Sequence, residues 1–124
     1  MGRVITNTKK FDKIAQEFGL SFLVLFGSQA NGLANDKSDY DIGYVSDENI
    51  DIDQEHKITQ LLKNEFRSSR VDFVNLHQTT PLLAKKALFD GKLIVENKDH
   101  SFANEQIRAY HNYVETKPLR NLYD

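Results

Sequence analysis

The sequence contains no cysteine, and this absence excludes two of the ways in which small proteins are held together. Without cysteine there can be no disulfide framework and no zinc site with thiolate ligands. A chain of 124 residues can bury a hydrophobic core without such supports, so we expect a single domain over residues 1–124. The lack of cysteine also fits a reducing compartment, and the sequence predicts a cytoplasmic protein.

An excess of positive charge is also missing. The chain has 16 lysine and arginine residues against 18 aspartate and glutamate residues, a net charge of −2 with histidine neutral. General nucleic-acid binders usually carry more basic charge, so direct nucleic-acid binding is not expected. No run approaches the roughly 20 apolar residues of a membrane-spanning helix, and the N-terminus lacks the apolar segment of a signal peptide. We therefore expect no association with a membrane.

The hydrophobic pattern predicts helices alternating with strands. Apolar runs or alternating residues predict strands over residues 22–26, 40–45, 71–76 and 93–95. Helices are expected over residues 11–18, from a cap at Asp51 or Asp53 to residue 66, from a cap at Thr79 or Thr80 to residue 90, and over residues 102–117. A short helical turn is also expected around residues 29–33. This order predicts an α/β (α+β) fold, with a small mixed β-sheet backed by helices on one side.

Residues 99–124 are expected to form a C-terminal helical extension of this domain. The apolar residues of its helix, which we assign to one face, are Phe102, Ile107, Tyr110 and Val114. A helix that packs against the domain is favoured over a docking surface for a partner, although interface composition leaves the second interpretation open.

Two aspartates lie one residue apart at the start of the second predicted strand. Side chains alternate along a strand, so Asp39 and Asp41 project from the same face. If Tyr40 and Ile42 point into the core, both carboxylates point into a cleft lined by the sheet. Two like charges so close repel each other unless a cation lies between them. Mg²⁺ suits this position, because it prefers one or two carboxylates together with substrate phosphates.

A Gly-Ser pair, Gly27 and Ser28, ends the first apolar run. Glycine lets the backbone approach a ligand closely, and free N–H groups at such a turn can bind phosphate oxygens. A phosphate site and a metal site joined by a ten-residue loop are the parts that nucleotidyl transfer requires. Asp72, on a separate predicted strand, can bind the same metal or deprotonate an attacking hydroxyl.

Each of these features is ordinary by itself: paired aspartates are common on surface loops, and Gly-Ser is a common turn. Their combination on apolar strands favours a site. Known phosphate motifs fit poorly, because no Lys-Ser or Lys-Thr follows GSQANG and no GxGxxG is present. The four histidines lack the spacing of metal ligands.

The combined pattern resembles the polymerase-beta-like nucleotidyltransferase superfamily, and the segment GSQANGLANDKSDYDIGY is similar to the minimal nucleotidyltransferases, the MNT or MntA-like antitoxins. The similarity covers about residues 10–98, including VDFVNL around Asp72 and the later FDGKLIVEN. The positions of the first segment that match the motif are Gly27, Ser28, Ala30, Gly32, Ala34, Ser38, Asp39 and Asp41.

The resemblance implies a mixed sheet with helices and a nucleoside triphosphate held at Gly27 and Ser28. It implies Mg²⁺ bound by Asp39 and Asp41, with Asp72 as the third ligand or as the base. By family analogy, the protein would be an antitoxin that transfers AMP from ATP to a tyrosine of a HEPN-domain RNase toxin.

Two alternatives remain open at this point. The same three aspartates would serve a nucleotidyltransferase that modifies a small aminoglycoside-like compound. The protein could also be an antitoxin that neutralises its toxin by binding alone, although three clustered acids are not needed for stability.

Overall fold

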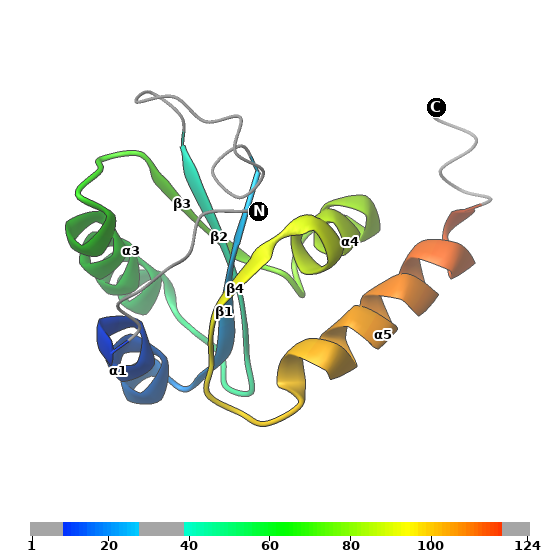
Figure 1. The fold of residues 1–124 in the computed structure, drawn as a ribbon, viewed down its shortest axis with the longest axis horizontal. Helices are drawn as coiled ribbons and strands as arrows, with labels where there is room; N and C mark the ends of the chain where they lie inside the picture. Colours follow the sequence, from blue (N-terminus) through cyan, green and yellow to red (C-terminus); the bar gives the residue numbers. More distant parts are fainter. Residues whose placement is uncertain (1–8, 28–38, 118–124) are drawn as a thin grey trace.

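The computed structural model describes residues 9–27 and 39–117, which form helices on both sides of a four-stranded β-sheet (Figure 1). The elements are α1 (Lys9–Phe18), β1 (Leu20–Phe26), β2 (Tyr40–Ser46), α3 (Ile52–Phe66), β3 (Val71–Asn75), α4 (Pro81–Asp90), β4 (Lys92–Glu96) and α5 (Ser101–Glu115). Each of these matches a predicted element, and the turn predicted around residues 29–33 lies outside the described residues. Among the described helices, none has both the length and the apolar character needed to span a membrane.

The sheet is mixed, as predicted, and its strand order is β3-β2-β1-β4. Strand β1 pairs antiparallel with both β2 and β4, whereas β3 runs parallel to β2 after the crossover through α3. The prediction of helices on one side is wrong, because α1 and α3 cover one face and α4 and α5 cover the other (Figure 1). A strand with apolar residues at every position, such as β1, needs cover on both faces.

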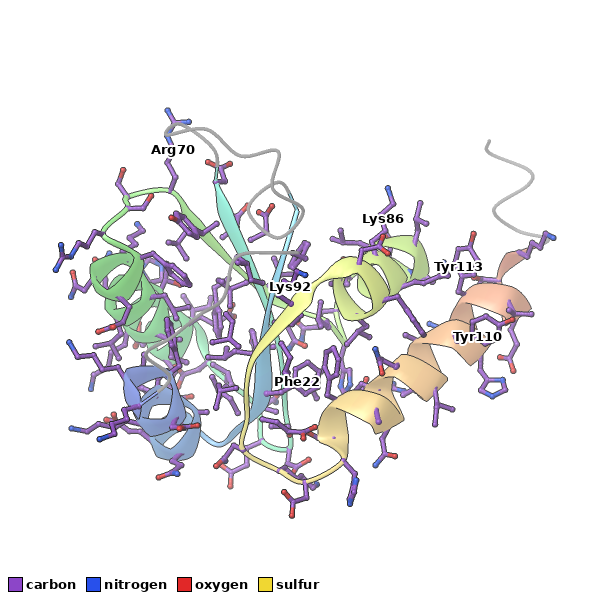
Figure 2. The ribbon with its side chains drawn as sticks, viewed as in Figure 1. Phe22, Arg70, Lys86, Lys92, Tyr110 and Tyr113 are labelled. Atoms are coloured by element: carbon purple, nitrogen blue, oxygen red, sulfur yellow. The ribbon has the colours of Figure 1, made fainter. Side chains whose placement is uncertain are left out.

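The face under α4 and α5 is built around Phe22, Val24 and Phe26 of β1. Phe22 meets the Phe102 ring of α5 edge-on, with centroids 5.2 Å apart. Figure 2 shows Phe22 lying between the sheet and α5. This contact and the buried Ala109 fix α5 against the domain.

The prediction of one apolar face in α5 is wrong in part. Ile107, Tyr110 and Val114 are 60%, 52% and 47% exposed, whereas Phe102 packs against the core. Five residues of helix place Ile107 about 140° around the axis from Phe102, so the two cannot face the same neighbour.

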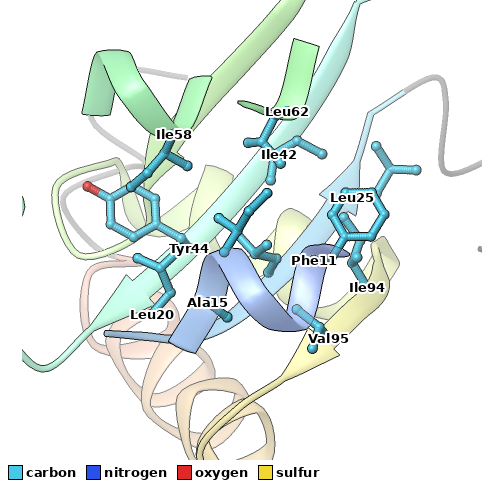
Figure 3. Close-up of a cluster of buried hydrophobic side chains, with 12 residues drawn as sticks. Phe11, Ala15, Leu20, Leu25, Ile42, Tyr44, Ile58, Leu62, Ile94 and Val95 are labelled. Carbon is cyan, nitrogen blue, oxygen red and sulfur yellow. The ribbon is translucent and has the colours of Figure 1, made fainter. Parts of the chain in front are cut away.

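The face under α1 and α3 holds the larger cluster of buried side chains (Figure 3). Ile42 and Tyr44 of β2 point into it, together with Ile58 and Leu62 of α3. Tyr40 packs against the edge of this cluster and stacks on Phe66, with ring centroids 4.5 Å apart. The alternation along β2 therefore sends the Asp41 side chain to the opposite face, as predicted.

Local capping explains where the helices begin. Asp51, rather than Asp53, caps α3: its carboxylate accepts from the Gln54 backbone N–H at 2.7 Å, and the Gln54 side chain accepts from the Asp51 N–H. Thr80, rather than Thr79, caps α4 by accepting from the Leu83 N–H, and Pro81 takes the first helical position.

Gly91 sets the distance between the end of α4 and β1. A β-carbon at this position would overlap the carbonyl oxygen of Ala87 and lie 2.8 Å from the carbonyl oxygen of Leu25. Both are backbone atoms that cannot rotate aside, so we expect Gly91→Ala to lower the free energy of unfolding by about 1–3 kcal/mol. Urea denaturation measures this loss, and an unchanged midpoint would contradict the tight approach of α4 to β1.

Candidate active site

The turn at Gly27 lies directly against Asp41. Register pairs Phe26 at the end of β1 with Asp41 of β2, so the next residue, Gly27, begins to turn away beside the carboxylate. Gly27 has φ +77°, and a β-carbon built on it would overlap the Asp41 carboxylate. The glycine is therefore required both by the backbone conformation and by the space that Asp41 occupies.

Asp41 and Asp72 are register partners on the adjacent parallel strands β2 and β3. Residues paired in this way project from the same face of a sheet. Burial, followed by the negative charges of Asp72 and Asp39, raises the pKa of Asp41 above its ordinary value. The structure thus gathers Gly27, Asp41 and Asp72, three of the five predicted site residues, at one end of the sheet.

Asp39 lies just before β2 and is exposed, at the margin of this group. The Arg70 guanidinium is 4.0 Å from its carboxylate, and the Tyr40 N–H donates to the Arg70 carbonyl oxygen at 2.8 Å. This backbone bond ties the start of β2 to the start of β3, and with it Asp39 to Asp72. The fifth predicted residue, Ser28, lies outside the described residues.

Three hollows among the described residues are lined by the site aspartates. One, of about 220 Å³, is lined by Asp39, Asp72 and residues 69–71. A second, of about 310 Å³, is lined by Asp72 and by residues of α3. The third, of about 350 Å³, lies between the sheet and α4 and is lined by Phe26, Gly27, Asp41, Leu83, Lys86 and Asp90.

The α4 wall of the 350 Å³ hollow was not predicted from the sequence, and neither was Arg70. Leu83, Lys86 and Asp90 share one helix face because they are three and four residues apart. The sequence alone shows that these three residues share a face. It does not show which face of α4 packs on the sheet, because that depends on how Ala87 and Leu88 pack. Arg70 could have been considered from the sequence, because it is a basic residue two positions before the candidate Asp72.

The donor set fits a cation that is shared with a substrate phosphate. Across residues 9–27 and 39–117, no three histidine, aspartate or glutamate side chains gather closely enough to hold a metal ion by themselves. Asp41 and Asp72 supply two neighbouring carboxylates, and their mutual repulsion is the environment that a cation relieves. Two carboxylates completed by phosphate oxygens are a common set for Mg²⁺.

Comparison with known proteins identifies relatives of the whole domain. The model of the family described as "Polymerase beta, Nucleotidyltransferase" matches residues 9–100 and so ends before α5. The chain is 32% identical, over 109 residues, to "Protein adenylyltransferase MntA" of Aphanizomenon flos-aquae (strain 2012/KM1/D3). That alignment covers 81% of this chain and 73% of the relative.

Solved structures share the fold at lower identity. A chain from a crystal structure named as a toxin–antitoxin with AMP-PNP superposes with a TM-score of 0.80 and 22% identity, covering 95% of both chains. A chain from a structure of the tri-AMPylated Shewanella oneidensis HEPN toxin in complex with MNT antitoxin gives a TM-score of 0.72 and 19% identity. The second match covers 94% of this chain and 91% of the other.

Proposed function

The chain belongs to the polymerase beta nucleotidyltransferase family, and we propose that it is an antitoxin that transfers AMP from ATP to a tyrosine of a HEPN-domain RNase toxin. The observation that carries this proposal is the placement of Gly27 against Asp41, with Asp72 beside it on the next strand. The choice of a protein acceptor is supported by the relative that is named a protein adenylyltransferase.

In this proposal each site residue has a defined task. Gly27 and Ser28 hold the triphosphate through backbone N–H groups and the serine hydroxyl. Asp39 and Asp41 would hold Mg²⁺, with Asp72 as the third ligand or as the base. The metal ion would supply positive charge against the phosphate oxygens as negative charge develops on them.

The transfer itself is a single displacement at the α-phosphorus of ATP. The tyrosine oxygen forms a bond to that phosphorus while the bond from the phosphorus to the oxygen that bridges to the β-phosphate breaks. In the role of base, Asp72 would accept the tyrosine proton, and pyrophosphate leaves with the bonding electron pair. The side chain of Asp72 is exposed on the edge strand β3, where a tyrosine on the surface of another protein can reach it.

Intact-mass spectrometry tests this function directly. The protein is incubated with ATP, Mg²⁺ and the HEPN-domain protein encoded beside it, with and without EDTA. We expect the partner to become heavier by whole AMP units only when the metal is present. A partner that forms a stable complex but keeps its mass would instead favour neutralisation by binding alone. An unmodified partner together with an adenylylated small hydroxyl compound would favour the small-molecule transferase.

A further inference from the structure

Lys86 lines the hollow that lies between the sheet and α4. Among the described residues that line this hollow, the other ionisable groups are Asp41 and Asp90, both acidic. A nucleoside triphosphate carries several negative charges, so a site that holds one needs cationic groups besides a metal ion. Lys86 is the residue of this wall whose charge complements that ligand.

The Lys86 ammonium has no ion-pair partner in the part of the chain that the structure describes, not even Asp90 four residues further along the same helix. A lysine that precedes an aspartate at this spacing is the less favourable order on a helix. Its neighbour Lys85 differs, because that ammonium lies 4.9 Å from the centre of the Tyr113 ring.

The strand order gives the direction of the reaction across the sheet. Asp72, Asp41 and Gly27 lie on β3, on β2 and at the end of β1, in that spatial order. The attacking and leaving oxygens of a phosphoryl transfer are roughly in line. If Asp72 activates the acceptor at the β3 edge, the leaving group departs toward β1 and the helix packed on it, α4.

We propose, resting on the function proposed above, that Lys86 binds the β- and γ-phosphates of ATP and stabilises the pyrophosphate as it leaves. Figure 2 shows Lys86 projecting from α4 toward the upper edge of the view, the edge at which Arg70 precedes β3. The long flexible side chain reaches from α4 toward the hollow that Gly27 and Asp41 line on the other side. Lysine acts on phosphate as a point charge and needs no fixed geometry.

Equilibrium binding of three nucleotides distinguishes binding of the β- and γ-phosphates by Lys86 from a nonspecific effect of the substitution on nucleotide binding. The probes are a non-hydrolysable ATP analogue, ADP and AMP, each with Mg²⁺ and measured by calorimetry. We expect Lys86→Gln to weaken binding of the ATP analogue about 10- to 100-fold, to weaken ADP binding and to leave AMP binding unchanged. Lys86→Arg, which keeps the charge, is expected to restore most of the affinity for the ATP analogue.

Lys85→Gln is the matched control, because it removes the same charge from the same helix on the side that faces Tyr113. It is expected to leave all three affinities unchanged. Equal losses for AMP and for the ATP analogue in Lys86→Gln, or no loss for either, would overturn the assignment of Lys86. An unsubstituted protein that binds no nucleoside triphosphate would instead overturn the proposed function itself, and the role of Lys86 with it.

Discussion

Asp41→Asn is expected to reduce AMP transfer by roughly a thousandfold or more while the protein stays folded. A bound metal ion contributes several kcal/mol of transition-state stabilisation, and each 1.36 kcal/mol is a factor of ten in rate. Asparagine keeps the volume of the side chain but removes the charge that would hold the metal beside Asp72. The rate of AMP incorporation into the toxin, measured with labelled ATP, gives this loss.

The same substitution is not expected to destabilise the metal-free protein. Burial and the charges of Asp72 and Asp39 raise the pKa of Asp41 in the folded state. A carboxyl with a raised folded-state pKa is ionised at a cost at neutral pH, and that cost disappears as the pH falls through the raised pKa. Asparagine removes this cost, so the thermal midpoint in EDTA should be equal to or above that of the unsubstituted protein.

Asp47→Asn provides the control for this pair of measurements. Asp47 follows the far end of β2 and forms an exposed ion pair with Lys98 at 2.9 Å. Exposed pairs of this kind contribute at most about 1 kcal/mol, and transfer should be unaffected. Near-normal transfer by Asp41→Asn would contradict the role of Asp41 as a metal ligand.

Much of the fold was predictable because the local signals agree with the tertiary structure. The apolar run of β1, the capped start of α3 and the proline at the start of α4 each predict the element that is found. The prediction that helices cover only one side of the sheet was wrong, although the apolar segment FLVLF (residues 22–26) indicates cover on both sides. A strand that is apolar at every position is typical of burial on both faces, and both faces of β1 are covered.

The candidate site was predictable to the extent that it depends on strands. Because side chains alternate along β2, Asp41 projects from the face opposite to that of Ile42. The parallel pairing of β2 with β3 then brings Asp72 beside Asp41. Lys86 was not predictable, because its position depends on which face of α4 packs against β1. The spacing of residues shows which of them share a face of α4, but it does not show which face packs against the sheet. For the same reason, the apolar residues of α5 were wrongly assigned to one face.

Gly27→Ala is expected to impair both stability and transfer. An alanine at φ +77° is strained by about 1–2 kcal/mol, and its β-carbon would overlap the Asp41 carboxylate. Relief of that overlap must move either the turn that we propose to hold phosphate or the carboxylate that we propose to hold the metal. A displacement of this size at a catalytic group can reduce the rate by about a hundredfold.

Gly19→Ala separates the two causes. Gly19 also has a positive φ, +68°, but no atom of the described residues lies within 4 Å of a β-carbon built there. Urea denaturation of Gly19→Ala therefore measures the backbone strain alone, whereas Gly27→Ala adds the overlap with Asp41. Equal losses of stability in the two variants, with transfer preserved in both, would contradict a constraint between Gly27 and Asp41.

A double substitution then isolates the contact itself. If the overlap is real, Gly27→Ala should destabilise the Asp41→Ala background less than it destabilises the unsubstituted protein, because alanine at position 41 leaves room for the new methyl group. Contacting residues commonly show interaction energies of about 0.5–3 kcal/mol in such cycles. An interaction energy in this range would be thermodynamic support, independent of activity, for direct contact between the turn at Gly27 and the side chain at position 41. Simple additivity would instead mean that the two act separately, and that Gly27 is needed for its backbone conformation alone.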